Sequence, residues 1–157
     1  MTVVGTLSTS GILVCVTIHE IQRALPTRGA AVSFVEGVYW PSGPRCPYCS
    51  NQSSTPVPRE LRHHCNVCNT TFAVTAGTFM HKTRLDLRQW LAACVLVLSG
   101  ARYVSVRALA REVGVNRNTA GRMIKRLRWA LLHDRDRLYE VLAAVSALLH
   151  EHEQDDE

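Results

Sequence analysis

The chain has 157 residues, of which 46% are hydrophobic and 20% are charged. This composition is typical of a folded soluble protein and excludes a wholly disordered chain. The length fits one ordinary domain or two to three very small ones. It leaves room for small binding modules, but not for such modules together with a catalytic domain of about 150 residues.

The net charge of +5 is unevenly distributed along the chain. Residues 1–81 carry five Lys or Arg and three Asp or Glu (+2), residues 82–129 carry eleven and two (+9), and residues 130–157 carry two and eight (−6). The basic middle predicts a segment that binds a polyanion. The acidic residues 151–157 predict a solvated C-terminus or an end that masks the basic segment.

No segment predicts a membrane span or a secretory signal. The apolar run of residues 12–18 is too short to cross a bilayer, and no basic stretch precedes it. We therefore expect a cytoplasmic protein without a membrane partner, whose six cysteines stay reduced unless they bind metal.

The first 40 residues predict an N-terminal arm and two short helices. Residues 1–18 are rich in Thr, Val and Gly without a clear period, which indicates a strand or a poorly ordered arm. Residues 18–25 have helical apolar spacing that stops at Pro26, and residues 30–39 place several apolar side chains on one side of a second helix. Residues 40–44 then break the helical pattern with two prolines and a glycine.

Two Cys-x-x-Cys pairs, Cys46 with Cys49 and Cys65 with Cys68, are separated by fifteen residues. A two-residue gap lets both thiolates of a pair face one ion, and two pairs complete a tetrahedron of sulfurs about 2.3 Å from zinc. The pattern predicts a structural Zn²⁺ site, because four thiolates leave no open position for water. The alternatives are two disulfides or four unrelated thiols.

Other histidines and cysteines are not expected to bind the metal. His63 and His64 directly precede the second cysteine pair and are alternative ligands, but strand positions that face solvent are the favoured interpretation. His81 is also not expected to be a ligand. Cys15 and Cys94 have no partner at ligand spacing and are predicted to be small buried apolar side chains.

Four helices are expected after the cysteine segment. The first covers residues 86–98, begins with a capping box of Asp86 and Gln89, and ends at Gly100. The second covers residues 105–113 and ends at Gly114, and the third begins at Asn116 or Asn118. The last carries an apolar stripe, which is either a homodimer seam or a face that folds back on the N-terminal helices. The stripe consists of Leu138, Val141, Leu142, Val145, Leu148 and Leu149.

Residues 106–125 have the pattern of a helix-turn-helix, with Gly114 at the turn and small or apolar residues where the helices pack. The alternative is a helical hairpin with a solvated basic face. The second helix shows residue types that contact base edges and phosphates, namely Asn116, Arg117, Asn118, Thr119, Arg122, Lys125 and Arg126. Upstream, Lys82, Arg84 and Arg88 are predicted to contact phosphate, and Trp90 is expected in the core.

Several stretches resemble the N-terminal DNA-binding region of zinc-ribbon transposases of insertion sequences. The ribbon is similar at residues 39–49 (YWPSGPRCPYC) and 65–79 (CNVCNTTFAVTAGTF), and the helix after it at residues 82–91 (KTRLDLRQWL). The helix-turn-helix of that family is similar at residues 108–115 (ALAREVGV) and 119–123 (TAGRM). Together these stretches cover about residues 30–130.

The resemblance implies a ribbon and a helix-turn-helix that recognise transposon ends. In the family, an acidic domain of RNase-H type follows and cuts DNA with divalent metal. This chain departs from that pattern, because only one helical stretch and the acidic end follow Arg128. The resemblance therefore implies the DNA-binding part without the nuclease.

The sequence thus predicts a mainly α protein with a small β zinc ribbon. Its expected parts are an arm with short helices (1–40), the zinc ribbon (41–81), a helix-turn-helix domain (82–130), and a C-terminal helix with an acidic tail (131–157). The expected ligands are Zn²⁺ and double-stranded DNA. No small-molecule substrate and no enzymatic activity are expected, because no nucleophile–base pair and no open metal site are recognisable.

The expected function is sequence-specific DNA binding at the nucleoid, by a transcription regulator derived from a transposase end-binding region. The residues expected to contact DNA bases are Arg117, Asn118, Thr119 and Arg122. Those expected to contact phosphates are Lys82, Arg88, Lys125 and Arg126. One alternative is an interaction module whose ribbon docks on a larger assembly. Another is the DNA-recognition subunit of a split transposase.

Overall fold

The structure, a computed structural model, describes residues 16–99 and 104–155. The expectations for the N-terminal arm, for Cys15 and for Gly100 fall outside these residues. The helices are α1 (Ile18–Ala24), α2 (Arg28–Tyr39), α3 (Leu87–Ser99), α4 (Val106–Val113), α5 (Arg117–His133) and α6 (Arg135–Asp155). Between α2 and α3 lie β1 (Ser54–Val57), a 3₁₀ turn (Pro58–Glu60), β2 (Arg62–Cys65) and β3 (Thr71–Phe72). The predicted class, mainly α with a small β ribbon, is confirmed.

Capping residues next to the first turn mark the starts of the helices. Thr17 caps α1 in a full capping box, in which Glu20 Oε2 accepts from Thr17 N at 2.6 Å. Asp86 Oδ1 accepts from the backbone N of Arg88 at 2.9 Å at the start of α3, and the predicted Gln89 Oε1 accepts from Asp86 N at 3.2 Å. Each cap satisfies backbone donors that the first turn leaves without a partner.

The helices pack around one apolar core. α3 lies at its centre and contacts α1, α2, α4, α5 and α6. Trp90 and Cys94 of α3 are buried there, as predicted from the sequence. Burial raises the pKa of the Cys94 thiol, so this cysteine remains a neutral apolar side chain.

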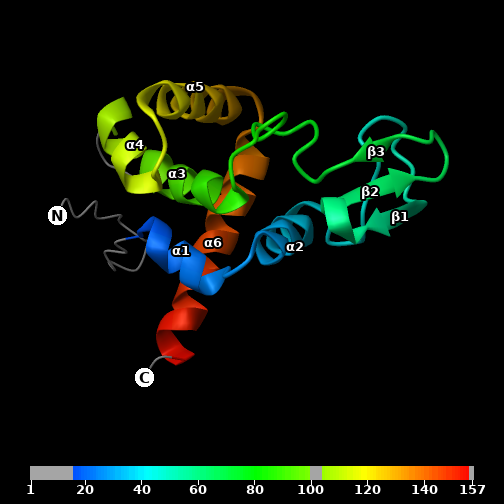
Figure 1. The fold of residues 1–157 in the computed structure, drawn as a ribbon, viewed down its shortest axis with the longest axis horizontal. Coiled ribbons are helices and arrows are strands. Elements are labelled where there is room, and N and C mark those ends of the chain that lie inside the picture. The colour runs from blue at the N-terminus through cyan, green and yellow to red at the C-terminus, as the bar shows by residue number, and fades with distance from the viewer. Residues whose placement is uncertain (1–15, 100–103, 156–157) are drawn as a thin grey trace.

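The apolar stripe of α6 folds back on its own chain. Leu138, Val141 and Val145 are fully buried against α1, α2, α3 and α5. Of the two alternatives for the stripe, this is the fold-back on the N-terminal helices, and Figure 1 shows α6 running behind α1 and α2. A homodimer through the C-terminal helix stays a prediction. Among the described helices, none is both long and apolar enough to cross a membrane.

The three strands form a separate antiparallel sheet in the order β1-β2-β3. Figure 1 shows this sheet beyond the C-terminal end of α2, away from the body of helices. Its core is small and consists of Cys46, Cys65 and Phe72, with Trp40 packed against them. The sheet therefore has little apolar burial of its own to stabilise it.

Candidate functional site

The four cysteines of the two pairs converge on one point. All four Sγ atoms lie within 4.8 Å of one another, with Cys46 Sγ 3.7 Å from Cys68 Sγ and Cys49 Sγ 3.5 Å from Cys65 Sγ. A tetrahedron with zinc–sulfur bonds of about 2.3 Å has sulfur–sulfur edges of about 3.8 Å. The observed distances fit such a tetrahedron, so these four residues can hold a metal ion.

The two pairs lie on turns of the same backbone shape. In the first, Cys46 N donates to Asn51 O at 2.9 Å, and in the second, Cys65 N donates to Thr70 O at 2.9 Å. The residue after each second cysteine, Ser50 or Asn69, has a positive φ of 61° or 55°. This left-handed residue reverses the chain, so that both thiols of a pair face the same side. The cysteine spacing predicts the pairs, but it does not predict these residues.

Sulfur chemistry at one ligand already favours metal binding. Thr70 Oγ1 lies 3.3 Å from Cys68 Sγ, and this hydrogen bond is the largest cause that lowers the pKa of Cys68, to about 6. Thiolate is the form that binds metal, so the lowered pKa of Cys68 favours binding. In the same cluster, the backbone hydrogen bond of Asn51 lowers the pKa of Cys49, but desolvation and hydrogen bonds from the neighbouring cysteines outweigh it and raise this pKa to about 12.

His63 has a different place from the one predicted. It does not face solvent, because its ring stacks on Phe72 and meets Trp40 edge-on at centroid distances of 5.8 and 5.5 Å. Its Nε2 lies 2.9 Å from Glu36 Oε1, which connects β2 to α2. The preference for cysteine over His63 as metal ligand agrees with the four-sulfur geometry, and His63 instead holds the ribbon against α2.

α4 and α5 form a packed pair with a short turn between them. Gly114 has a φ of 71°, which a residue with a side chain rarely adopts, and its N–H donates to Ala110 O. Asn116 then caps α5, with its Oδ1 accepting from Thr119 N at 2.8 Å. Of the two predicted starting residues, Asn116 is the one observed. Its side-chain oxygen is committed to the cap, which leaves only its amide N–H groups for another partner.

Most of the predicted DNA-contacting residues lie on the outer face of α5. Arg117, Asn118, Arg122 and Lys125 are exposed, and Thr119 is half-buried. The opposite face of the helix is buried and includes Ala120, Met123 and Leu127. The helix therefore presents a continuous basic and amide-bearing surface to solvent.

Arg88 is committed to contacts inside the protein. Its Nε and Nη2 donate to Asp86 at 2.9 and 2.7 Å, and its Nη1 donates to Leu25 O and Pro26 O at 3.3 and 3.1 Å. These bonds hold the α1–α2 turn against the start of α3. We therefore do not include Arg88 among the residues that contact DNA, although its sequence position suggested it.

Arg126 and Lys82 lie close to one another, although 44 positions separate them. Arg126 Nη1 donates to Phe79 O at 3.4 Å and to His81 O at 2.6 Å, which attaches α5 to the segment that leads out of the ribbon. Lys82 is exposed and follows directly after that segment.

The outer face of α5 changes character towards its end. Trp129 is 55% exposed and stacks on His133, and Leu132 is 80% exposed. Sequence reasoning missed this patch. The signal was present, because Trp129 and Leu132 follow Lys125 at helical spacing on the same face.

One comparison with known proteins found a family model that matches part of the chain. Residues 26–71 match the family model described as a transposase zinc-ribbon domain. The match includes α2, both cysteine pairs, β1 and β2, and it covers less than a third of the chain. No curated protein and no solved structure matches the chain.

Proposed function

We propose that this protein binds duplex DNA in a sequence-specific way, and that it acts at the nucleoid as a transcription regulator derived from a transposase end-binding region. The transposase zinc-ribbon match supports a relation to transposases. The observation that carries the proposal is the outer face of α5, where Arg117, Asn118, Arg122 and Lys125 lie exposed behind a tight turn.

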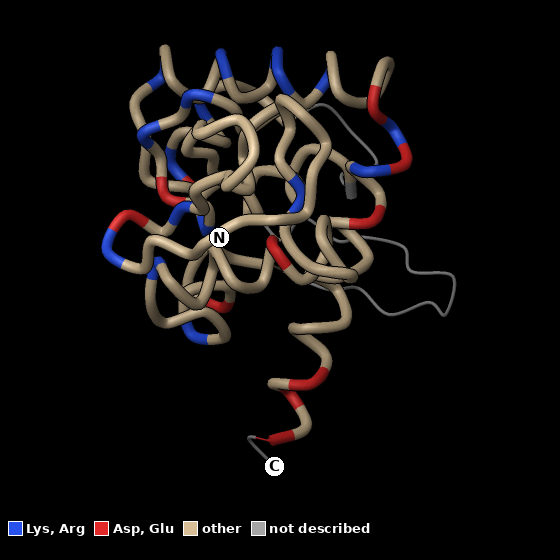
Figure 2. Tube along the Cα trace, turned by 90° about the vertical axis from the view of Figure 1, so that its right-hand side faces the viewer, with Lys and Arg blue, Asp and Glu red and all other residues tan. Residues whose placement is uncertain are grey.

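In this proposal α4 and α5 act as a helix-turn-helix and α5 enters the major groove. Arg and Asn near the start of such a helix contact guanine and adenine edges, while Lys125 contacts phosphate. Figure 2 shows Lys and Arg along the edge that α5 forms, and Asp and Glu on the far end of α6. The acidic residues at the C-terminal end of α6, Glu151, Glu153 and Asp155, thus lie away from α5, which leaves the basic face open to DNA and disfavours masking by them.

We further propose that the ion held by the four cysteines is Zn²⁺. Four thiolates in a tetrahedron suit zinc or iron, and neither redox chemistry nor an open position is needed for a purely structural ion. Its role would be to fix the two turns and the sheet. Elemental analysis of the purified protein tests this assignment, with one zinc per chain expected.

The direct test of DNA recognition is selection of bound sequences from a random duplex pool, followed by binding titrations. The selected site should bind more tightly than random duplex by a factor of about 10³ or more. Replacing Arg117 or Asn118 by alanine should cost about 1–3 kcal/mol on the selected site and relax the preference at one position. Arg28→Gln, an exposed change at the start of α2, serves as the control and should leave the preference unchanged.

Enrichment of no sequence at modest salt would refute sequence-specific recognition. A reporter gene that carries the selected site tests the regulatory role, because its expression should depend on the protein and on Arg117. Expression that does not respond would restrict the function to DNA binding.

A second candidate is an interaction module that docks on a larger assembly. It is favoured by Tyr48 and Val67, which lie in the centres of the two cysteine turns and are 61% and 56% exposed. Charge reversal at Arg117 and Arg122 distinguishes the two functions. Loss of the biological effect supports DNA reading, whereas its survival together with sensitivity to Tyr48→Ser supports docking.

A third candidate is the DNA-recognition subunit of a split transposase, which the family match also supports. In that case the selected sequence would be the end of a mobile element, and cleavage would require a separate chain. We propose recognition and not catalysis for this chain, because an ion with four thiolate ligands offers no position for water or substrate. Incubation of the protein with its selected duplex and Mg²⁺ should leave the strands intact.

A further inference from the structure

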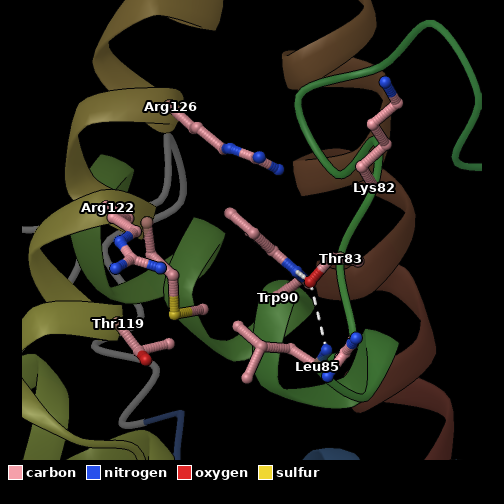
Figure 3. Close-up of a pocket in the computed structure, with 9 residues that line it drawn as sticks. Lys82, Thr83, Leu85, Trp90, Thr119, Arg122 and Arg126 are labelled. Carbon is pink, nitrogen blue, oxygen red and sulfur yellow. Dashed lines mark hydrogen bonds between the residues drawn. The ribbon is translucent and has the colours of Figure 1, made fainter.

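Cations from two distant parts of the chain meet around one pocket. It has a volume of about 440 Å³ and lies between the segment of residues 82–85 and α5. Lys82 and Arg84 line it from the segment, and Arg122 and Arg126 from α5. Figure 3 shows Arg126 reaching from α5 towards this pocket, Arg122 further along the same helix, and Lys82 and Thr83 on the opposite side. None of the described residues that line it is acidic.

Three of these four cationic side chains have no compensating group among the described residues, and the fourth, Arg126, has only backbone carbonyls as partners. In the described part of the chain, the side chains of Lys82, Arg84 and Arg122 make no hydrogen bond or ion pair. Like charges gathered around a partly enclosed space repel one another and attract an anion. Packing gives no reason for such an arrangement, since Lys82 and Arg84 are exposed and cover no core.

Arg126 is held in place at the edge of the pocket. Its Nη1 donates to Phe79 O and His81 O, which fixes the guanidinium and leaves its other three N–H groups without a partner among residues 16–99 and 104–155. A guanidinium fixed in this way binds an oxyanion without a further loss of side-chain freedom.

Thr83 offers a hydroxyl that can only donate. Its Oγ1 accepts from Leu85 N at 3.1 Å and from Trp90 Nε1 at 3.0 Å, which uses both lone pairs. The hydroxyl proton is therefore left for an acceptor. Thr83 lines the pocket, so a ligand bound there would meet a fixed donor as well as the four cations.

We propose that this pocket binds a phosphate group, and that in the DNA complex this group is a backbone phosphodiester beside the groove that α5 enters. The inference rests on the proposed DNA binding. It gives the segment of residues 82–85 a role of its own: together with α5 it encloses one phosphate, which fixes how the helix lies in the groove.

The test combines Arg84→Gln with neutral methylphosphonate linkages placed one at a time in the selected duplex. For the wild-type protein, one linkage near the α5 footprint should weaken binding about tenfold, and Arg84→Gln should reduce most of that sensitivity. The slope of log affinity against log salt should fall by about 1, with the sequence preference unchanged. The matched control Arg28→Gln removes the same charge at an exposed position that does not line the pocket, and it should keep the sensitivity to that linkage.

Two results would overturn the inference while DNA recognition stands. One is an Arg84→Gln protein with the affinity and salt slope of the Arg28→Gln control. The other is an Arg84→Gln protein that stays fully sensitive to every neutral linkage that affects the wild type.

If no duplex binds, the proposed function fails and the pocket is tested with inorganic phosphate alone. The indole N–H of Trp90, observed by NMR, is a reporter because it donates to Thr83 Oγ1 at the pocket wall. A shift that Arg84→Gln abolishes and Arg28→Gln retains would support a site for free phosphate and overturn the DNA backbone as its source. No shift would overturn phosphate binding itself.

Discussion

Leu138→Ala tests whether the α6 stripe stabilises this chain from within. Leu138 lies in α6 with no exposed surface, packed in the core that α1, α2, α3 and α5 share. Its truncation removes buried methyl groups and leaves a cavity, because the surrounding helices relax only in part. The matched control is Leu132→Ala, the same chemical change on a side chain that is 80% exposed.

The expected costs differ by several kcal/mol. At a fully buried site, Leu→Ala typically lowers the free energy of unfolding by about 3 kcal/mol or more. For a chain of this size, 3 kcal/mol lowers the melting temperature by about 6–12 °C. Leu132→Ala should change the free energy of unfolding by no more than about 0.5 kcal/mol.

Chemical unfolding followed by circular dichroism, at two protein concentrations tenfold apart, measures both effects. We expect the loss at Leu138 to be the same at both concentrations, because the packing lies within one chain. The reasoning would be refuted if Leu138→Ala and Leu132→Ala had equal stability. It would also be refuted if Leu138→Ala merely converted a dimer into an equally stable monomer.

Three further predictions follow from other parts of the fold. Chelation of the metal should unfold the ribbon, because such an ion contributes on the order of 10 kcal/mol to folding. The helices should stay folded, because they have a separate core. Loss of most helical circular dichroism on chelation would contradict this. Asp86→Asn should lower the free energy of unfolding by about 0.5–1 kcal/mol at pH 7, because hydrogen bonds from Arg88 lower the pKa of Asp86. The difference from wild type should be fully present above about pH 4. It should vanish as the pH falls through the lowered pKa of the folded state, which unfolding measured at several pH values tests. Gly114→Ala should lower the free energy of unfolding by about 1–2 kcal/mol, because the φ of Gly114 is 71°. Gly37→Ala should raise it by about 0.5–1 kcal/mol, because Gly37 lies inside α2 with nothing within 4 Å of the added Cβ. Denaturant titrations measure both changes.

Features that depend on neighbours in the chain were predictable from the sequence. The cysteine spacing predicted the metal ligands, because two residues between cysteines suffice to bring both thiols to one side. Helix ends were predictable for the same reason, since a cap bonds to backbone only two or three residues away, as Asp86 and Asn116 do.

Features that depend on distant partners required the structure. Arg88 has the appearance of a phosphate contact in the sequence, yet carbonyls of Leu25 and Pro26, more than 60 positions away, take up its guanidinium. His63 is turned inward by Glu36 and Trp40, which belong to another element. Neither partner is visible from residues near Arg88 or His63.

The sequence by itself determined where the helices begin, which residues can hold a metal ion and which helix face is basic, because capping, chelation and helical period act over a few residues. Only the tertiary structure decided that the α6 stripe packs inside its own chain, and that Lys82 and Arg84 face Arg122 and Arg126 across one pocket. The physical reason is that an apolar stripe gains the same free energy from any apolar partner. Likewise, the residues next to a cation in the sequence do not indicate whether its side chain lies in solvent or beside a pocket. The choice between such alternatives lies in packing between segments that are far apart along the chain.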